Sequence, residues 1–135
     1  MKLLLNSIIL SLLATAGTDC PAVETGNVTV KRMRVTAYCS CKKCCGKDAN
    51  GITACNHKIL PGDKFVAADK SIPFGTRIFI PGYCEHPVEV LDRGGAIKGD
   101  RLDLYFGDKD GMTGHERAME WGVKYLEVKI YGVTK

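Results

Sequence analysis

The stretch that decides the fold is "VLDRGGAIKGDRLDLYF", Val90 to Phe106, which places three aspartates among residues that otherwise alternate like a β-strand. In "RLDLYF", residues 101–106, the leucines and the phenylalanine would face the core and the alternate residues would face away from it. The Asp103 carboxyl would then project from a rigid strand on the face opposite the core. Asp92 ends the preceding strand, before two glycines that permit a sharp turn.

Outward from this stretch, further short alternating runs predict strands that are separated by Pro-Gly and Gly-Gly turns. Six such strands are typical of a small barrel or sandwich. One helix interrupts them, because Thr113 and Glu116 form a capping box and Gly122 can end the helix. The predicted strands are residues 28–38, with a slip near Lys31, and residues 64–69, 76–81, 87–92, 101–106 and 124–132.

The chain of 135 residues, 45% hydrophobic and 25% charged, suits one domain with a single modest core. Residues 1–16 have the pattern of a Sec signal peptide, with an early lysine, a mostly apolar run and small residues at the cleavage site. That run is shorter than the roughly 20 apolar residues of a membrane-spanning helix. Residues 17–27 would be a short tether, and residues 28–135 the domain.

Charge excludes one class of partner. Cleavage after Ala16 would remove Lys2 and leave 18 basic and 15 acidic residues, a net charge of +3. This balance is far too weak to indicate nucleic acid, although it mildly favours an anionic polymer. We expect a monomer exported to the periplasm, the cell envelope or the extracellular space. Outer-membrane association stays open, although Asp19 before Cys20 departs from the usual lipidation motif.

The seven cysteines first indicate disulfides, because an exported protein meets an oxidising environment. The odd count leaves at least one cysteine unpaired, most easily Cys20. The adjacent Cys44 and Cys45 would bond different partners, for example Cys55 and Cys84. We expect two or three disulfides that hold the Cys-rich loop of residues 39–57 between strands, formed among Cys39, Cys41, Cys44, Cys45, Cys55 and Cys84.

A zinc site is an alternative use of the same cysteines, and a redox role is a third. The motif "CSCKKCCG" could supply three thiolates to one ion, although this spacing alone is not diagnostic. No other cofactor is expected. The zinc ligands would be Cys39, Cys41 and Cys44, with a fourth from Cys45, Cys55 or His57.

For several other polar and aromatic residues, the sequence predicts only whether the side chain is exposed or buried. Asp100 suits a solvated turn, and Trp121 suits the core. His57 and His86 are expected to be exposed in loops. His115 is expected on the surface of the first helical turn. The alternative is that it lines a cleft.

Three motifs, in this order, resemble the 3D domain family, which is named for three aspartates. The family includes MltA-type membrane-bound lytic transglycosylases and small secreted bacterial cell-wall proteins linked to stationary-phase survival. The resemblance runs from about Val35 to Tyr131 and implies a mainly β fold, a six-stranded double-psi β-barrel with one short helix and the Cys-rich loop. The motifs are "AADKSIPFGTRIFIPGY" (67–83), "VLDRGGAIKGDRLDLYFG" (90–107) and "AMEWGVKYLEVKIYG" (118–132).

The resemblance implies that the substrate is peptidoglycan, cleaved between N-acetylmuramic acid and N-acetylglucosamine to give 1,6-anhydro products. The glycosidic oxygen is a poor leaving group, so a protonated carboxyl must donate to it as the bond breaks. Most glycosidases need a second carboxylate as nucleophile or base. A lytic transglycosylase can use one acid/base, because the C6 hydroxyl of the substrate traps the oxocarbenium-like centre.

The three aspartates of the family correspond to Asp69, Asp92 and Asp103. Asp103 would be the acid/base, Asp92 would raise its pKa or stabilise developing positive charge, and Asp69 would complete the acidic site. Arg93 and Arg101 would hold the lactyl carboxylate of muramic acid. The predicted substrate contacts are Arg93, Gly94, Gly95, Arg101 and Tyr105, the last by stacking on a sugar ring.

Other interpretations of the same residues stay open. Asp92 could form an Asx-turn, and Asp103 could form a salt bridge with Arg101 or Arg93. The whole chain could be a non-catalytic, expansin-like wall-binding barrel, or a secreted metal or redox protein built on the cysteines.

Overall fold

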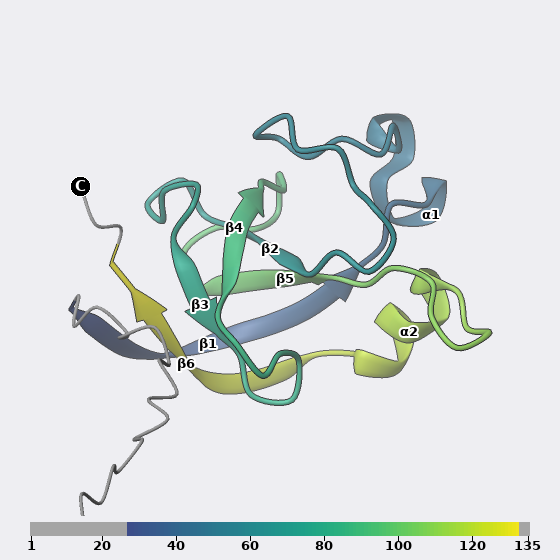
Figure 1. The fold of residues 1–135 in the computed structure, drawn as a ribbon. Helices are drawn as coiled ribbons and strands as arrows, with labels where there is room; N and C mark the ends of the chain where they lie inside the picture. Colours follow the sequence, from purple (N-terminus) through teal and green to yellow (C-terminus); the bar gives the residue numbers. More distant parts are fainter. Residues whose placement is uncertain (1–26, 133–135) are drawn as a thin grey trace, which may run out of the picture.

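The computed structural model describes residues 27–132, which form a closed barrel with short helices beside it (Figure 1). The predicted signal peptide, Cys20 and almost all of the predicted tether lie outside these residues. The elements are β1 (Val28–Tyr38), α1 (Lys42–Cys45), the 3-10 turn η1 (Gly46–Asp48), β2 (Phe65–Ala68), β3 (Arg77–Phe79), β4 (Val88–Asp92), β5 (Arg101–Tyr105), α2 (Gly114–Trp121) and β6 (Lys124–Tyr131).

All six predicted strands are present, each within two residues of its predicted bounds. Around the barrel they follow the order β1-β5-β2-β4-β3-β6. The pairs β1·β5 and β2·β4 are parallel, and the other four pairs are antiparallel. A six-stranded mixed barrel is therefore confirmed. Within residues 27–132, no helix has the length and apolar character needed to span a bilayer.

The predicted slip near Lys31 was wrong. β1 pairs with β6 without interruption from Val28↔Tyr131 to Val35↔Lys124. The apolar alternation breaks because residues 28–32 are exposed and precede the pairing of β1 with β5, which begins at Arg34. With no core beneath that end of the strand, the pattern of its side chains is unconstrained.

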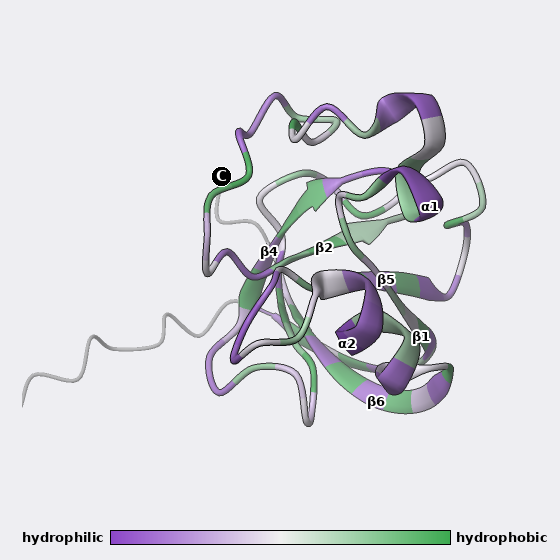
Figure 2. Ribbon diagram, turned by 90° about the vertical axis from the view of Figure 1, so that its right-hand side faces the viewer, coloured by the Kyte–Doolittle hydropathy of each residue, from purple (hydrophilic) through white to green (hydrophobic). Residues whose placement is uncertain are grey.

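The barrel interior confirms which face of β5 is apolar. Leu102 and Leu104 are fully buried in the main core cluster, and Phe106 packs against its edge. Trp121 of α2 also packs against this cluster, as predicted. The opposite face of β5 is covered too, because Tyr105 belongs to a second buried cluster. In Figure 2, hydrophobic colour runs along much of β2 and β4, whereas α2 is mostly hydrophilic.

Helix α2 begins and ends as its sequence predicts. The Thr113 hydroxyl accepts a hydrogen bond from the Glu116 N–H, and the Glu116 carboxylate accepts one from the Thr113 N–H, which completes the capping box. Gly122 ends the helix at a φ of 67°, a conformation that favours glycine.

Between β1 and β2 the chain leaves the barrel over residues 39–63, which we call the excursion. The prediction of one helix is incomplete, because the excursion adds α1 and η1. Helix α1 forms where the Cys41 carbonyl accepts hydrogen bonds from the N–H groups of Cys44 and Cys45, at 3.1 and 2.9 Å. Neither α1 nor η1 has a buried residue, so local contacts have to hold this region.

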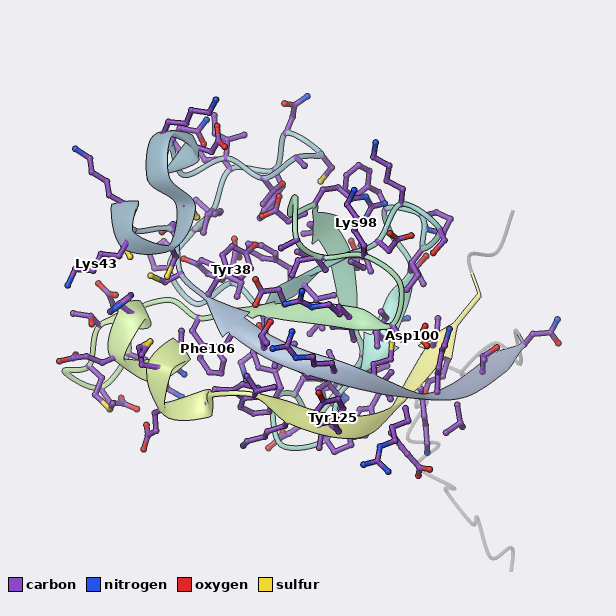
Figure 3. The ribbon with its side chains drawn as sticks, turned by 180° about the vertical axis from the view of Figure 1, so that it is seen from behind. Tyr38, Lys43, Lys98, Asp100, Phe106 and Tyr125 are labelled. Atoms are coloured by element: carbon purple, nitrogen blue, oxygen red, sulfur yellow. The ribbon has the colours of Figure 1, made fainter. Side chains whose placement is uncertain are left out.

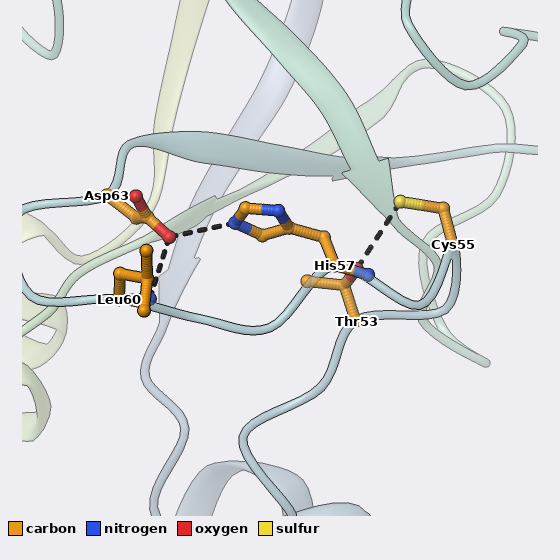
Figure 4. A network of polar contacts seen from close by, with 5 residues as sticks. All are labelled: Thr53, Cys55, His57, Leu60 and Asp63. Atoms are coloured by element: carbon orange, nitrogen blue, oxygen red, sulfur yellow. Dashed lines mark hydrogen bonds and ion pairs between the residues drawn. The ribbon is translucent and has the colours of Figure 1, made fainter.

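One such contact network lies at the end of the excursion (Figure 4). An Asp63 carboxylate oxygen lies 2.8 Å from His57 Nε2 and accepts a hydrogen bond from the Leu60 N–H. Burial opposes ionisation of Asp63, but these contacts lower its pKa below the ordinary value. The predicted exposure of His57 was wrong: the residue is half-buried, because its ring packs edge-on against Phe65. His86 is exposed, as predicted.

Candidate functional site

A pocket of about 460 Å³ lies between the barrel and the excursion. Asp92 and Asp103 line it together, as do Arg93, Gly94 and Gly95 of the turn after β4. The facing wall comes from excursion residues between Ser40 and Ile59. The structure thus brings two of the three predicted aspartates into one cavity.

Strand β2 sets the spacing of the two carboxyl groups. Ala67 pairs with Asp103 of β5 on one side and with Asp92 of β4 on the other. A bulge in the β2·β4 ladder creates the second pairing, since Val66 pairs with Val90 and the register then skips Leu91. Bulges commonly redirect side chains at functional sites. Here the bulge brings Asp92 level with Asp103, across a small alanine.

Three donors hold the Asp92 carboxyl. Tyr38 Oη donates to Oδ2 at 2.5 Å, and the N–H groups of Ala54 and Arg93 donate to Oδ1 at 2.8 and 2.9 Å. Burial, together with the nearby Asp92, raises the pKa of Tyr38, so its hydroxyl stays protonated and donates. Asp92 is an acceptor in every one of these contacts, and one of its donors belongs to the excursion.

The Asp103 carboxyl accepts fewer hydrogen bonds than the Asp92 carboxyl. It is half-buried, and its Oδ1 accepts a hydrogen bond from Thr36 Oγ1 at 2.9 Å. Burial raises its pKa above the ordinary value, the neighbouring Asp92 adds to this, and Thr36 and Arg101 only partly oppose it. The Asp103 carboxyl therefore keeps its proton at a higher pH than an exposed aspartate. A carboxyl group tuned in this way can act as a general acid.

The third predicted aspartate lies elsewhere. Asp69 is absent from the pocket lining and sits in the turn after β2, where its Oδ1 accepts a hydrogen bond from the Ser71 N–H at 2.8 Å. Hydrogen bonds from Ser71 lower the pKa of Asp69. The structure therefore places Asp69 in a turn and not beside the other two carboxyl groups.

The two arginines predicted to hold the substrate carboxylate donate hydrogen bonds to main-chain carbonyls instead. The Arg93 guanidinium donates to the carbonyls of Ala68, Asp92 and Ile72 at 3.2, 3.2 and 2.7 Å. It also stacks over the Phe74 ring at 4.0 Å from the centroid. Arg101 lies outside the pocket lining and donates to the Ala96 carbonyl at 2.9 Å. Among residues 27–132, neither arginine forms an ion pair with Asp103.

Tyr105 and Asp100 are also away from the pocket. Tyr105 is 6% exposed, and its ring stacks on Phe65 with centroids 4.6 Å apart, so this ring is part of the core and not an open platform for a sugar. Asp100 is exposed and pairs with Lys31, in agreement with the predicted solvated turn. Figure 3 shows Asp100 and Tyr38 well apart along the barrel.

Sequence reasoning missed the side chains that hold the carboxyl groups. Thr36 and Tyr38 are two residues apart on β1, and the parallel register places them opposite Asp103 and Tyr105. Their spacing was a usable signal, but only after β1 had been paired with β5. Pairing of strands 63 or more residues apart in sequence is a tertiary property.

The predicted disulfides are not formed, because all six described cysteines carry free thiols. Cys45 donates to the Cys39 carbonyl, and Cys84 contacts the main chain of Ile80. Both thiols therefore contact main-chain atoms, and not the sulfur of another cysteine as predicted. Three other cysteines, Cys39, Cys41 and Cys44, gather instead with His115 between the β1–α1 segment and α2.

The family model of the 3D domain matches residues 64–133, which is over half of the chain, so the chain belongs to the 3D domain family. The match begins at the end of the excursion and includes all three predicted aspartates. The family assignment made from the three motifs is thereby confirmed.

Two curated relatives come from Bacillus subtilis (strain 168). The chain is 36% identical over 109 residues to a protein named "Putative cell wall shaping protein YabE", covering 79% of this chain and 24% of YabE. It is 37% identical over 71 residues to "Cell wall-binding protein YocH", covering 52% of this chain and 22% of YocH. The chain therefore spans about a quarter of the length of these relatives.

Two solved structures of the Escherichia coli lytic transglycosylase MltA are also similar. The apo-2 form of an MltA variant matches with a TM-score of 0.45 and 26% identity, covering 62% of this chain and 28% of that chain. A second crystal structure of MltA matches with a TM-score of 0.46 and 30% identity over the same shares of both chains.

Proposed function

We propose that this protein is an exported peptidoglycan lytic transglycosylase that cleaves the β-1,4 bond between N-acetylmuramic acid and N-acetylglucosamine. The observation that carries the proposal is the pair of carboxyl groups in one pocket, with the pKa of Asp103 raised by burial. The names of the two relatives, which refer to the cell wall, support a location in the cell envelope or outside the cell.

In the proposed mechanism, the Asp103 carboxyl protonates the glycosidic oxygen as the bond to the sugar breaks. The resulting carboxylate then takes the proton of the C6 hydroxyl, whose oxygen attacks the anomeric carbon and closes the 1,6-anhydro ring. Asp92 stabilises the positive charge that develops between these steps. Its orientation is fixed by Tyr38 and by the Ala54 and Arg93 N–H groups, which costs no reorganisation during the reaction.

The glycan strand is proposed to lie against Gly94 and Gly95, where the pocket opens. Gly95 is exposed, and a Cβ there would meet nothing within 4 Å, so the main chain is accessible. Asp69 is proposed to support the turn after β2, outside the chemistry. For the barrel itself, we propose the double-psi class, which is supported by the two parallel pairs, β1·β5 and β2·β4.

A non-catalytic wall-binding barrel is the second candidate, because one relative is named as cell wall-binding. Both candidates use the same pocket and the same polymer. They differ in whether Asp103 is needed for binding alone or for bond cleavage.

The experiment that tests the proposal is mass spectrometry of purified sacculi after digestion by the native protein, by Asp103→Asn and by Asp100→Asn. Asp100→Asn is the matched control, because it removes a carboxyl three residues away in sequence that is exposed and outside the pocket. We expect anhydro-muropeptides from the native protein and from Asp100→Asn, and a loss of about 10²- to 10⁴-fold for Asp103→Asn.

Two outcomes would contradict the proposed enzymatic mechanism. If none of the three proteins releases product while all still pellet with sacculi, the chain is a wall-binding barrel. If Asp103→Asn keeps full activity, another group is the acid. Circular dichroism of each variant checks that its fold is intact.

A further inference from the structure

The side-chain cluster between α1 and α2 touches the carboxylate pocket only at Cys44, which lines the pocket wall, and it has no part in the proposed mechanism. It consists of the thiols of Cys39, Cys41 and Cys44 and the imidazole of His115, whose ligand atoms all lie within 4.8 Å of one another. Figure 3 shows the sulfur atoms gathered where α1 approaches α2. We propose that these four residues bind one zinc ion, and that this ion fixes the excursion to the barrel.

The distances between the donor atoms fit tetrahedral coordination. Zn–S bonds of about 2.3 Å and Zn–N bonds of about 2.0 Å place two sulfurs about 3.8 Å apart and a sulfur and a nitrogen about 3.5 Å apart. His115 Nδ1 lies 3.6 Å from Cys41 Sγ and 3.4 Å from Cys44 Sγ. The Cys39 and Cys44 sulfurs are 3.5 Å apart. Cys39 and Cys41, at 2.9 Å, would open by about 1 Å around the ion.

The fourth ligand comes from a residue that the spacing of the cysteines could not indicate. Cys45 donates to a carbonyl, Cys55 contacts Thr53, and His57 contacts Asp63, so the three predicted candidates are all engaged elsewhere. His115 is 71 residues beyond Cys44 in sequence. Only the packing of α2 against the end of β1 brings it to the cluster.

Gly114 provides independent support for this juxtaposition. A Cβ at residue 114 would lie 2.3 Å from the Phe106 carbonyl oxygen and 3.1 Å from the Cys39 Cβ. A glycine is therefore required for α2 to approach Cys39 this closely. The Gly114 N–H also donates to Asp108 at 2.6 Å, which holds the first turn of the helix in place. The turn that is pressed against Cys39 is the one that presents His115.

Three thiolates and one imidazole leave no open position on a tetrahedral ion, so the site is structural and not catalytic. The bound group would carry one net negative charge, which the exposed Lys42 and Lys43 of α1 offset. The ion would join three segments: the end of β1, α1 and α2. Neither α1 nor η1 has a buried residue, and such segments gain most from a metal cross-link.

The same excursion forms a wall of the carboxylate pocket, and its Ala54 N–H donates to Asp92. Zinc would therefore act on the pocket by holding this wall, to which its ligand Cys44 belongs. Metal binding itself does not depend on the proposed reaction, and it can be measured without any glycan.

The test is the zinc content of the full-length protein purified under reducing conditions, together with the absorption spectrum after Co²⁺ replacement. We expect about one zinc ion per chain and a cobalt spectrum of a tetrahedral site with thiolate charge-transfer bands. Cys41→Ser and His115→Ala should each weaken zinc binding by more than about tenfold, since even indirect ligand partners commonly contribute that much. Cys55→Ser and His86→Ala are the matched controls and should keep full affinity.

Chelation gives a second readout on the unmodified protein. Removing zinc should make the excursion sensitive to protease before the barrel unfolds, and added zinc should restore its resistance. The proposal is overturned if the reduced native protein binds neither zinc nor Co²⁺. It is also overturned if His115→Ala binds zinc as tightly as His86→Ala, or if the purified protein contains a Cys39–Cys41 disulfide and no metal.

Discussion

In the barrel, residues such as Val66 and Leu104 are completely buried, whereas in the excursion only Cys39 and Thr53 are buried. The two regions therefore have different sources of stability. Apolar burial, which is non-directional and large, holds the barrel. Hydrogen bonds and the thiol–imidazole cluster, which are directional and few, hold the excursion.

The carboxylate pocket lies at the boundary of these two regions, and this position explains its chemistry. The barrel supplies Asp92 and Asp103 from rigid strands, so their separation is fixed by the ladder through Ala67. The excursion forms the facing wall of the pocket, and burial of Asp103 raises the pKa of its carboxyl. A change in the barrel should therefore affect folding, whereas a change in the excursion should affect the pocket first.

The largest effect on stability is expected in the barrel core. Leu104→Ala should lower the free energy of unfolding by about 2–5 kcal/mol, because it leaves a cavity at a fully buried site. Ile52→Ala, in the excursion and 49% exposed, should change it by less than about 0.5 kcal/mol. Urea denaturation of both variants measures the contrast. Similar losses for the two would mean that the excursion is part of the core.

The junction of the two regions should show an intermediate effect. Gly114→Ala places a methyl group against the Phe106 carbonyl, so α2 must move, at a cost of about 1–3 kcal/mol. Gly95→Ala has open space and serves as the control, with an unfolding free energy close to that of the native protein. Thermal unfolding compares the two, and a stable Gly114→Ala variant with unchanged zinc affinity would contradict the close approach of α2.

The pH dependence of stability tests the effect of burial on the Asp103 carboxyl. Because the folded-state pKa of Asp103 is raised, ionisation destabilises the fold, and this loss appears as the pH rises from the unfolded pKa, about 3.9, through the folded value. Asp103→Asn should therefore gain stability over the native protein as pH increases. Below about pH 3, where both side chains are neutral, the difference should reach a constant value. Melting curves across this range would reject the raised pKa if the stability of Asp103→Asn relative to the native protein stayed constant or decreased as the pH increased.

The smallest effect is expected at the surface of the barrel. Asp100→Asn breaks the ion pair between Asp100 and Lys31. The Lys31 side chain is 47% exposed and the Asp100 side chain is 59% exposed. Such a pair contributes about 0–1 kcal/mol, and salt screens it. We expect a change below about 0.5 kcal/mol that disappears in high salt. A larger loss in urea denaturation would show that this turn is coupled to the core.

Alternation along each strand was enough to predict all six strands, because one face of each meets the barrel core and a period of two follows from that burial. At residues 28–32, where both faces are exposed, the break in alternation wrongly predicted a slip in β1. The capping box likewise predicted the start of α2, since its hydrogen bonds join residues three apart. The excursion offered no such periodicity, and its helical turns were missed.

The candidate site was predicted less completely than the fold. Asp92 and Asp103 were found together with the glycines beside them, but Thr36, Tyr38 and the Ala54 N–H were not. Arg93 was assigned to a substrate, although main-chain carbonyls engage its guanidinium. An isolated sequence shows which groups can donate and accept, but it does not show which partners are already taken.

The sequence by itself determined the strands and the cap of α2, because each depends on residues close together in the chain. Only the tertiary structure decided that a bulge at Leu91 brings Asp92 level with Asp103. It also decided that His115 meets Cys41 and Cys44. Those contacts join segments far apart in sequence, and their geometry exists only after the barrel has closed and α2 has packed against it.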